Sequence, residues 1–173
     1  MISSKDSAKA FASRPVILHV EDSEMDHEAL KRALHKVGTI AQLFWCKNVD
    51  DAFDYLHHSG PYDQLPAPRP SLILLDLNLP GENGTSFLQR LRKTPKFSSI
   101  VVVVLSSSSN PIDIERCYDL GANAYLLKTL DPRELQPKIL SLAQFWLGHC
   151  VLPSGQPREV GESAHGAVQG THA

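Results

Sequence analysis

Polar side chains that could bind both an anion and a hard cation follow four short apolar runs in the sequence. The set holds three carboxylates, one hydroxyl and one ammonium group. Its members are Glu21, Asp22, Asp76, Ser106 and Lys128. Carboxylate oxygens are the ligands that Mg2+ prefers, while a hydroxyl and an ammonium group can contact phosphoryl oxygens. These residue types therefore suggest phosphoryl chemistry beside a divalent cation, provided that the fold brings them together.

Five apolar runs alternate with amphipathic segments over most of the chain. The runs lie at 16–20, 43–46, 72–75, 100–105 and 124–127. The segments with helical periodicity lie at 24–37, 50–58, 85–91, 112–120 and 135–147. This alternation predicts an α/β fold of the (βα)5 type around a parallel sheet. The near-continuous Leu, Ile and Val content of the third and fourth runs predicts central strands that helices cover on both faces.

The five polar residues each follow the end of a predicted strand. The carboxyl ends of parallel strands meet at one edge of the sheet, where ligands bind in such folds, so we expect these side chains to converge. Asp22 and Asp76, with Glu21 acting through water, would then bind Mg2+. Lys128 and Ser106 would contact the phosphoryl oxygens. Since an aspartate can form an aspartyl phosphate, and phosphoryl transfer depends mainly on positioning and charge neutralisation, the set contains every part needed.

Four sequence blocks resemble the response-regulator receiver family in order and spacing. They read "LHVEDS", "LILLDLNLPGENG", "VVVLSSS" and "AYLLK", and the resemblance covers residues 15–147. It implies a doubly wound, five-stranded parallel sheet with the flavodoxin-like strand order 2-1-3-4-5. It also implies a phosphorylation-controlled switch of a two-component system, not an enzyme. Two departures are the Glu-Asp pair, where Asp-Asp is commoner, and Thr129, where a proline is usual.

The resemblance also implies a role for each site residue. Asp76 is the phosphoacceptor, and Lys128 is the family's lysine at the end of the fifth strand. Ser106 and Tyr125 are the switch hydroxyl and the switch aromatic. The alternative for Tyr125, which lies in a predicted strand beside Leu126 and Leu127, is a core residue. The Mg2+ ligands implied are the side chains of Glu21, Asp22 and Asp76 and the main-chain carbonyl of Asn78.

Four segments resemble the small stand-alone response regulators that serve bacterial phytochrome kinases. They are the long loop before the third predicted strand, the segments "DLNLPGENG" and "CYDLGANAYLLK", and the aromatic end "AQFWL". The histidine kinase implied as partner is therefore a bacteriophytochrome.

The end of the last predicted helix carries more bulky apolar residues than a one-sided covering stripe needs. Receiver domains commonly self-associate on this side. We therefore predict a homodimer formed by the fourth helix, the fifth strand and the fifth helix, with Leu142, Phe145 and Trp146 in the interface. The alternative is that Phe145 and Trp146 both close the core beneath the helix.

The length and composition, 173 residues with 42% hydrophobic and 21% charged, predict one globular domain. We expect the receiver domain at 14–149, with flexible segments at 1–13 and 150–173. A net charge of -2 with scattered basic residues does not favour nucleic acid as a partner. No run is long enough to span a bilayer and no signal-type run begins the chain, so we expect no membrane partner. Three cysteines without paired spacing fit the cytoplasm.

Other classes of function remain open from the sequence. A degenerate receiver could act as an unphosphorylated protein-binding module with the same fold. An aspartate-nucleophile phosphohydrolase needs a second acid two residues after the nucleophile, and Asn78 at that position argues against it. A flavodoxin-like cofactor carrier is disfavoured because an acidic pair follows the first strand in place of a phosphate cradle. His57, His58 and His149 lack the spacing of a metal site.

Overall fold

The computed structural model describes residues 14–36, 38–129 and 131–153. One parallel sheet has the strand order β2-β1-β3-β4-β5, which confirms the predicted (βα)5 architecture. The strands are β1 (Val16–Val20), β2 (Gln42–Cys46), β3 (Leu72–Leu75), β4 (Val101–Ser106) and β5 (Ala124–Leu127). The helices are α2 (Glu24–Lys36), α3 (Val49–His57), α4 (Gly84–Lys93), α5 (Pro111–Asp119) and α6 (Pro132–Ala143), with a 3-10 turn η1 (Gly60–Tyr62) and a π-helical turn η2 (Gln144–His149). Val37, the predicted segment 1–13 and most of the segment 150–173 lie outside the described residues.

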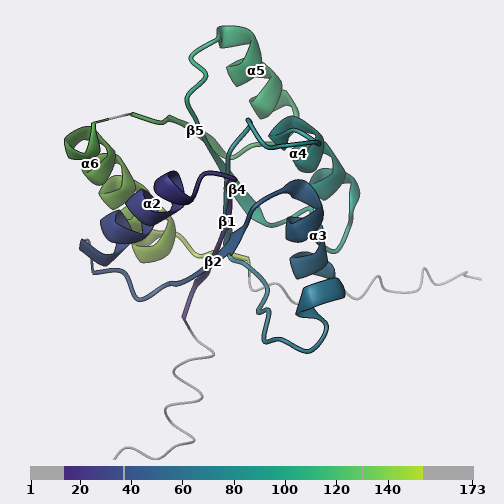
Figure 1. Ribbon diagram of the computed structural model, residues 1–173. Helices are drawn as coiled ribbons and strands as arrows, with labels where there is room; N and C mark the ends of the chain where they lie inside the picture. The colour runs from purple at the N-terminus through teal and green to yellow at the C-terminus, as the bar shows by residue number, and fades with distance from the viewer. Residues whose placement is uncertain (1–13, 37, 130, 154–173) are drawn as a thin grey trace, which may run out of the picture.

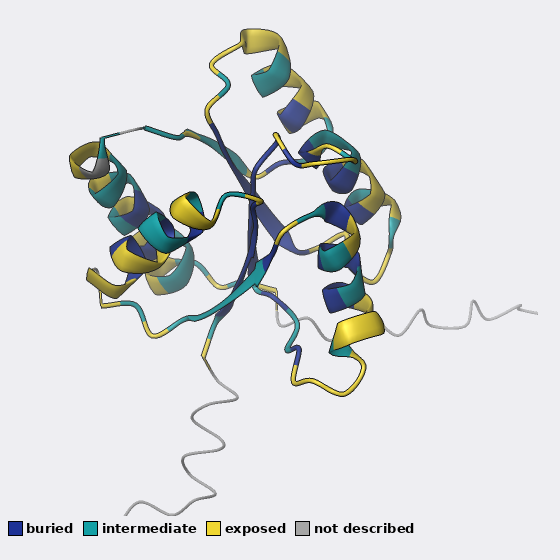
Figure 2. Cartoon of the chain, viewed as in Figure 1, coloured by how far each residue is buried: buried dark blue, intermediate teal, exposed yellow. Residues whose placement is uncertain are grey.

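Helices cover both faces of the sheet, with α2 and α6 on one side and α3, α4 and α5 on the other (Figure 1). Alternate residues of the central strands enter two separate apolar clusters. Leu72 and Leu74 of β3 pack with α2 and α6, whereas Ile73 and Leu75 pack with the other three helices. This two-sided packing is why the strands read as continuous apolar runs, and they form the buried centre in Figure 2.

Short polar side chains cap the amino ends of the five helices. Each cap accepts a hydrogen bond from a backbone N–H in the first helical turn, which satisfies a donor that has no partner within the helix. The caps are Ser23 of α2, Asn48 of α3, Asn83 of α4, Asn110 of α5 and Asp131 of α6. Pro137 lies inside α6, which begins at Pro132 and continues to Ala143.

The carboxyl-terminal end of α6 requires a correction to the predicted interface. Leu142 is only 4% exposed and belongs to the cluster between α6 and the sheet, so it is a core residue. Ile139, Leu142 and Trp146 recur at helical spacing and face that cluster, where Trp146 is partly buried. Phe145 falls between them and is 54% exposed. The alternative in which both aromatic residues close the core therefore holds for Trp146 alone.

The loop from β3 to α4 passes close to the backbone that follows β3. The Gly84 N–H donates a hydrogen bond to the Leu77 carbonyl at 3.0 Å. A Cβ on Gly84 would lie 2.2 Å from the Asp76 carbonyl oxygen and 2.8 Å from the Leu77 Cα. Only glycine allows this approach, and it fixes the main chain at the residue that ends β3.

Gly84→Ala should therefore destabilise the fold by about 2 kcal/mol or more, because backbone atoms must move to admit the methyl group. Urea unfolding measures this change. Gly148→Ala is the matched control, since no atom lies within 4 Å of the position that its methyl group would take. It should stay within about 0.5 kcal/mol of the wild type. Equal stability of the two variants would show that the close approach at Gly84 does not constrain the fold.

Candidate functional site

The carboxyl edge of the sheet brings the predicted carboxylates and the lysine together. Glu21, Asp22 and Asp76 each offer an oxygen, and these oxygens lie within 4.8 Å of one another. Lys128 Nζ donates to Glu21 Oε2 at 2.6 Å and to Asp76 Oδ2 at 2.9 Å. All four residues line one cavity of about 480 Å³. The predicted convergence of these four side chains is thus present in the structure.

Main-chain hydrogen bonds extend the sheet ladder one residue past each strand and hold these residues in place. The Glu21 N–H donates to the Cys46 carbonyl at 2.9 Å, and the Asp76 N–H donates to the Val20 carbonyl at 3.0 Å. The Lys128 N–H donates to the Ser106 carbonyl at 2.8 Å. Because the ladder fixes the backbone of all three charged residues, their separation depends on the register of the sheet.

Ser106 and Tyr125 lie beside the β4–α5 loop. Ser106 is fully buried, and the cavity wall at this point is formed by its neighbours Leu105 and Ser107. The Ser106 Oγ accepts a hydrogen bond from the Ser108 N–H at 3.3 Å. The Tyr125 hydroxyl donates to the Ser108 carbonyl at 2.8 Å, while its ring packs against the cluster of α3, α4 and α5. Tyr125 is thus both a packing residue and a polar contact to the loop.

Asp26 is a site residue that the sequence analysis missed. It lies in the first turn of α2, where its N–H donates to the Ser23 Oγ at 3.2 Å. Its Oδ2 accepts a third hydrogen bond from Lys128 Nζ at 2.8 Å. The available signal was its place in a helix that begins directly after Asp22, because the first turn of that helix must lie beside the carboxyl edge of β1.

An aromatic stack lies behind Glu21. His27 stacks on Trp45 with ring centroids 4.3 Å apart, and its Nδ1 lies 3.1 Å from the Nδ1 of His19. The Trp45 indole N–H donates to the Glu21 carbonyl at 2.6 Å. Burial lowers the pKa of His19 to about 3, so this imidazole is neutral. No charge from His19 therefore balances the Glu21 carboxylate, whose Oε2 lies 3.7 Å from the His19 Nε2.

The charges of the cavity are unevenly matched. Burial raises the pKa of Glu21 to about 7, although the hydrogen bond from Lys128 opposes this shift. Burial alone would lower the pKa of Lys128, but hydrogen bonds to Asp26 and Glu21 and the charge of Asp76 raise it above its usual value. Lys128 therefore stays protonated, while Glu21 loses its proton at a higher pH than an ordinary glutamate.

The donor set fits a hard divalent cation. Three carboxylates with mutually close oxygens are the arrangement that Mg2+ uses when it keeps some of its waters. Four carboxylates, including Asp26, share the cavity with one ammonium group, so a second cation would relieve their repulsion. The main chain of Asn78 also lies at this point, since its N–H donates to Asp76 Oδ1 at 3.3 Å.

Comparison with known proteins identifies the class of this domain. Residues 17–140 match the response regulator receiver domain, and the chain belongs to that family. Within the part that the structure describes, no helix is long and apolar enough to cross a membrane.

Individual relatives are more specific. The chain is 37% identical over 140 residues to the response regulator Rcp1 of Synechocystis sp., covering 80% of this chain and 93% of that protein. The crystal structure of the phosphorylated cyanobacterial phytochrome response regulator RcpA matches with a TM-score of 0.76 and 34% identity, covering 82% of this chain and 100% of the other. The Mn2+-bound form of Rcp1 matches with a TM-score of 0.75 and 35% identity, covering 81% and 99%. The chain is therefore similar to phytochrome response regulators.

Divalent-cation affinity should rise about tenfold from about pH 6 to about pH 8. The cation must displace the proton that Glu21 holds below its raised pKa of about 7, so binding strengthens as this carboxyl ionises. Calorimetric titration with Mn2+ measures the affinity, and the indole of Trp45 offers a fluorescence signal beside the site. Glu21→Gln should bind more weakly and lose most of this dependence on pH. The same slope in both proteins would contradict the role of Glu21.

Proposed function

We propose that this receiver domain is a phosphorylation-controlled response regulator in which a histidine kinase phosphorylates Asp76. The observation that supports this most is the pairing of Asp76 Oδ2 with Lys128 Nζ at 2.9 Å inside an acidic, partly buried cavity. Asp76 has both a cationic partner, Lys128, and two further carboxylates, Glu21 and Asp22, with oxygens within 4.8 Å. It is thus placed both to receive a phosphoryl group and to share a metal ion.

In the transfer step, a carboxylate oxygen of Asp76 attacks the phosphorus of a phosphohistidine. An O–P bond forms as the P–N bond breaks, and the imidazole keeps the electron pair and takes a proton from solvent. Lys128 balances the added negative charge. Asp22, Asp76 and the Asn78 carbonyl, with Glu21 through water, would hold Mg2+, which would supply further charge neutralisation. The protein's share is positioning, and the domain acts as a switch.

The switch would use the contacts of Ser108. If the Ser106 hydroxyl turns to a phosphoryl oxygen, the Ser108 N–H loses its acceptor at 3.3 Å. The same residue holds the Tyr125 hydroxyl through its carbonyl, so the loop and the tyrosine would move together. Ser106 and Tyr125 are therefore proposed as the switch pair.

The partner that we propose is a bacterial phytochrome kinase in the cytoplasm. Support comes from the similarity to RcpA, a cyanobacterial phytochrome response regulator described in its phosphorylated form.

We also propose that the receiver domain spans residues 14–149. Leu152, which lies beyond that boundary, still packs against the cluster of α2 and α6.

Asp76→Asn should abolish labelling by phosphorylated kinase or by a small acyl phosphate, because the amide cannot act as the nucleophile. Incorporation of radioactive phosphate, stable to neither strong acid nor base, is the measurement. Asp50→Asn is the control: this exposed residue on α3 undergoes the same charge change but does not line the cavity, and labelling should be unaffected. Full labelling of Asp76→Asn would exclude the assignment, and an unlabelled wild type would favour a degenerate, unphosphorylated receiver.

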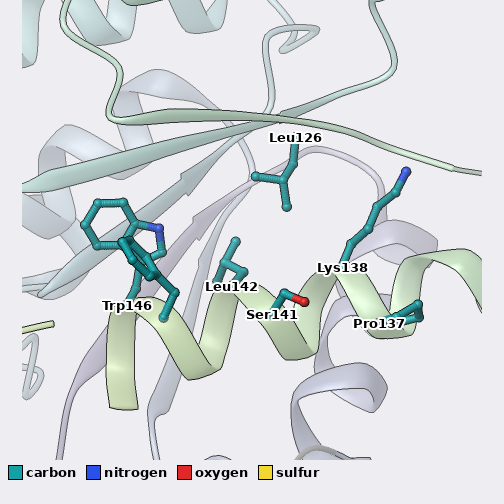
Figure 3. A pocket seen from close by; sticks show the side chains of 7 residues that line it. Leu126, Pro137, Lys138, Ser141, Leu142 and Trp146 are labelled. Carbon is teal, nitrogen blue, oxygen red and sulfur yellow. The ribbon is translucent and has the colours of Figure 1, made fainter. Parts of the chain in front are cut away.

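A homodimer through α5, β5 and α6 is a further part of the proposal. An apolar groove of about 430 Å³ runs between β5 and α6, with Leu126 facing Leu142 and Trp146 at one end (Figure 3). Leu142 forms part of the floor of this groove as a core residue. The exposed ring of Phe145 lies at its rim and is the side chain best placed to enter a partner. A two-fold pair would bury the same groove on both subunits.

Phe145→Glu should convert a dimer to a monomer at micromolar concentration while leaving Asp76 labelling intact. A dimer would bury the new carboxylate without an opposite charge, which destabilises the interface. Because Phe145 is exposed in the monomer, the substitution should not disturb the core. Sedimentation velocity gives the mass. Ile40→Glu, a change at an equally exposed apolar residue before β2, should remain dimeric. A wild type that stays monomeric with and without a phosphoryl analogue would rule out this interface.

A further inference from the structure

The ammonium group of Lys128 has no unused proton in this structure. An ammonium group donates three hydrogen bonds, and Lys128 Nζ makes three, at 2.6 Å to Glu21, 2.8 Å to Asp26 and 2.9 Å to Asp76. A phosphoryl group on Asp76 needs a donor from the same nitrogen. Phosphorylation turns the Asp76 carboxylate into an aspartyl phosphate, which frees one proton of Lys128 for the new oxygens. A second contact with the phosphoryl group requires Lys128 to release Glu21 or Asp26.

The three carboxylates differ in what their release would cost. The side chain of Glu21 is 1% exposed and that of Asp76 is 7% exposed, so neither can exchange the lysine for bulk water. The side chain of Asp26 is 42% exposed, so water can replace the lysine at its oxygens. Asp26 is thus the partner that is released most easily.

We propose that Asp26 is a positioning residue that holds Lys128 while Asp76 is unphosphorylated and is released when the phosphoryl group arrives. This inference rests on the proposed phosphorylation of Asp76. Asp26 competes with the phosphoryl oxygens for Lys128, and its negative charge opposes the incoming group. Both effects slow the phosphorylation of Asp76 and reduce its extent, so the Asp26 carboxylate is inhibitory.

The geometry of α2 allows Asp26, and not the neighbouring Glu28, to contact Lys128. The Asp26 N–H is anchored to the Ser23 Oγ in the first helical turn, and Leu30 and Leu34 bury the same helix against α6 and the sheet. Glu28, two residues further along, lies outside the cavity and pairs with Lys31 at 3.0 Å. The same helix therefore offers a second carboxylate that carries an equal charge but does not reach Lys128.

Asp26→Asn should be labelled by a small acyl phosphate, with Mg2+ present, about threefold to tenfold faster than the wild type, and to a higher plateau. Asp26→Glu keeps a carboxylate within reach of Lys128 and should restore a rate near the wild-type value. Glu28→Gln removes the same charge and should label at the wild-type rate, which separates the contact from a general charge effect. A rate for Asp26→Asn at or below that of the wild type would overturn the proposal.

A second measurement tests the hold without phosphorylation. Proton–nitrogen NMR of lysine ammonium groups in the metal-free protein should show a slowly exchanging Lys128 signal, assigned by its loss in Lys128→Arg. Asp26→Asn should shift and broaden this signal, whereas Glu28→Gln should leave it in place. If the wild type is not labelled on Asp76 but the signal depends on Asp26, the proposed function fails and the hold stands. If the signal is the same in Asp26→Asn, the hold itself is wrong.

Discussion

The site depends on one unequal balance of charge: a single ammonium group, Lys128, facing more carboxylates than it can neutralise. It contacts Glu21, Asp26 and Asp76 directly, and Asp22 lies within reach of two of them. In a partly buried cavity such repulsion is costly, and the charge of Asp76 adds to the burial that raises the pKa of Glu21. A divalent cation reduces this cost, and a phosphoryl group gives Lys128 a new partner. The site is thus built to respond to both.

Such a site requires a rigid frame, because carboxylates free to separate would relieve their repulsion by moving apart. The ladder bonds that follow β1, β3 and β5 fix the backbone of Glu21, Asp76 and Lys128. Apolar packing on both faces holds the strands in register, and the contact of Gly84 with the Asp76 main chain blocks movement at the end of β3. The packed core thus holds the carboxylates close together in spite of their repulsion.

The fold and the convergence of Glu21, Asp22, Asp76 and Lys128 could be predicted from the sequence for a simple physical reason. The carboxyl ends of parallel strands lie at one edge of the sheet, so the residues that follow the apolar runs are expected to be neighbours. Asp26 could not be placed in this way, because its contact with Lys128 joins a helix to a strand end 102 residues away and depends on the tilt of α2. Leu142 was misplaced because the sequence shows how the apolar residues of α6 are spaced but not which of them face the sheet. The histidine stack behind the site was also missed, since a histidine within an apolar run gives no sign of its partners.

Contacts on the two sides of the sheet give the site two separate routes to the rest of the molecule. On one side, Ser108 links the Ser106 hydroxyl to Tyr125 of β5, and its own hydroxyl donates to Asp113 of α5 at 2.7 Å. A change at Ser106 would therefore reach both α5 and β5, two of the three elements of the proposed dimer face. On the other side, Lys128 is tied through Asp26 to α2, which packs against α6. Because both routes begin at Asp76 and reach neighbouring parts of one surface, the release of Asp26 and the movement of Ser108 would act on the same interface from opposite faces of the sheet.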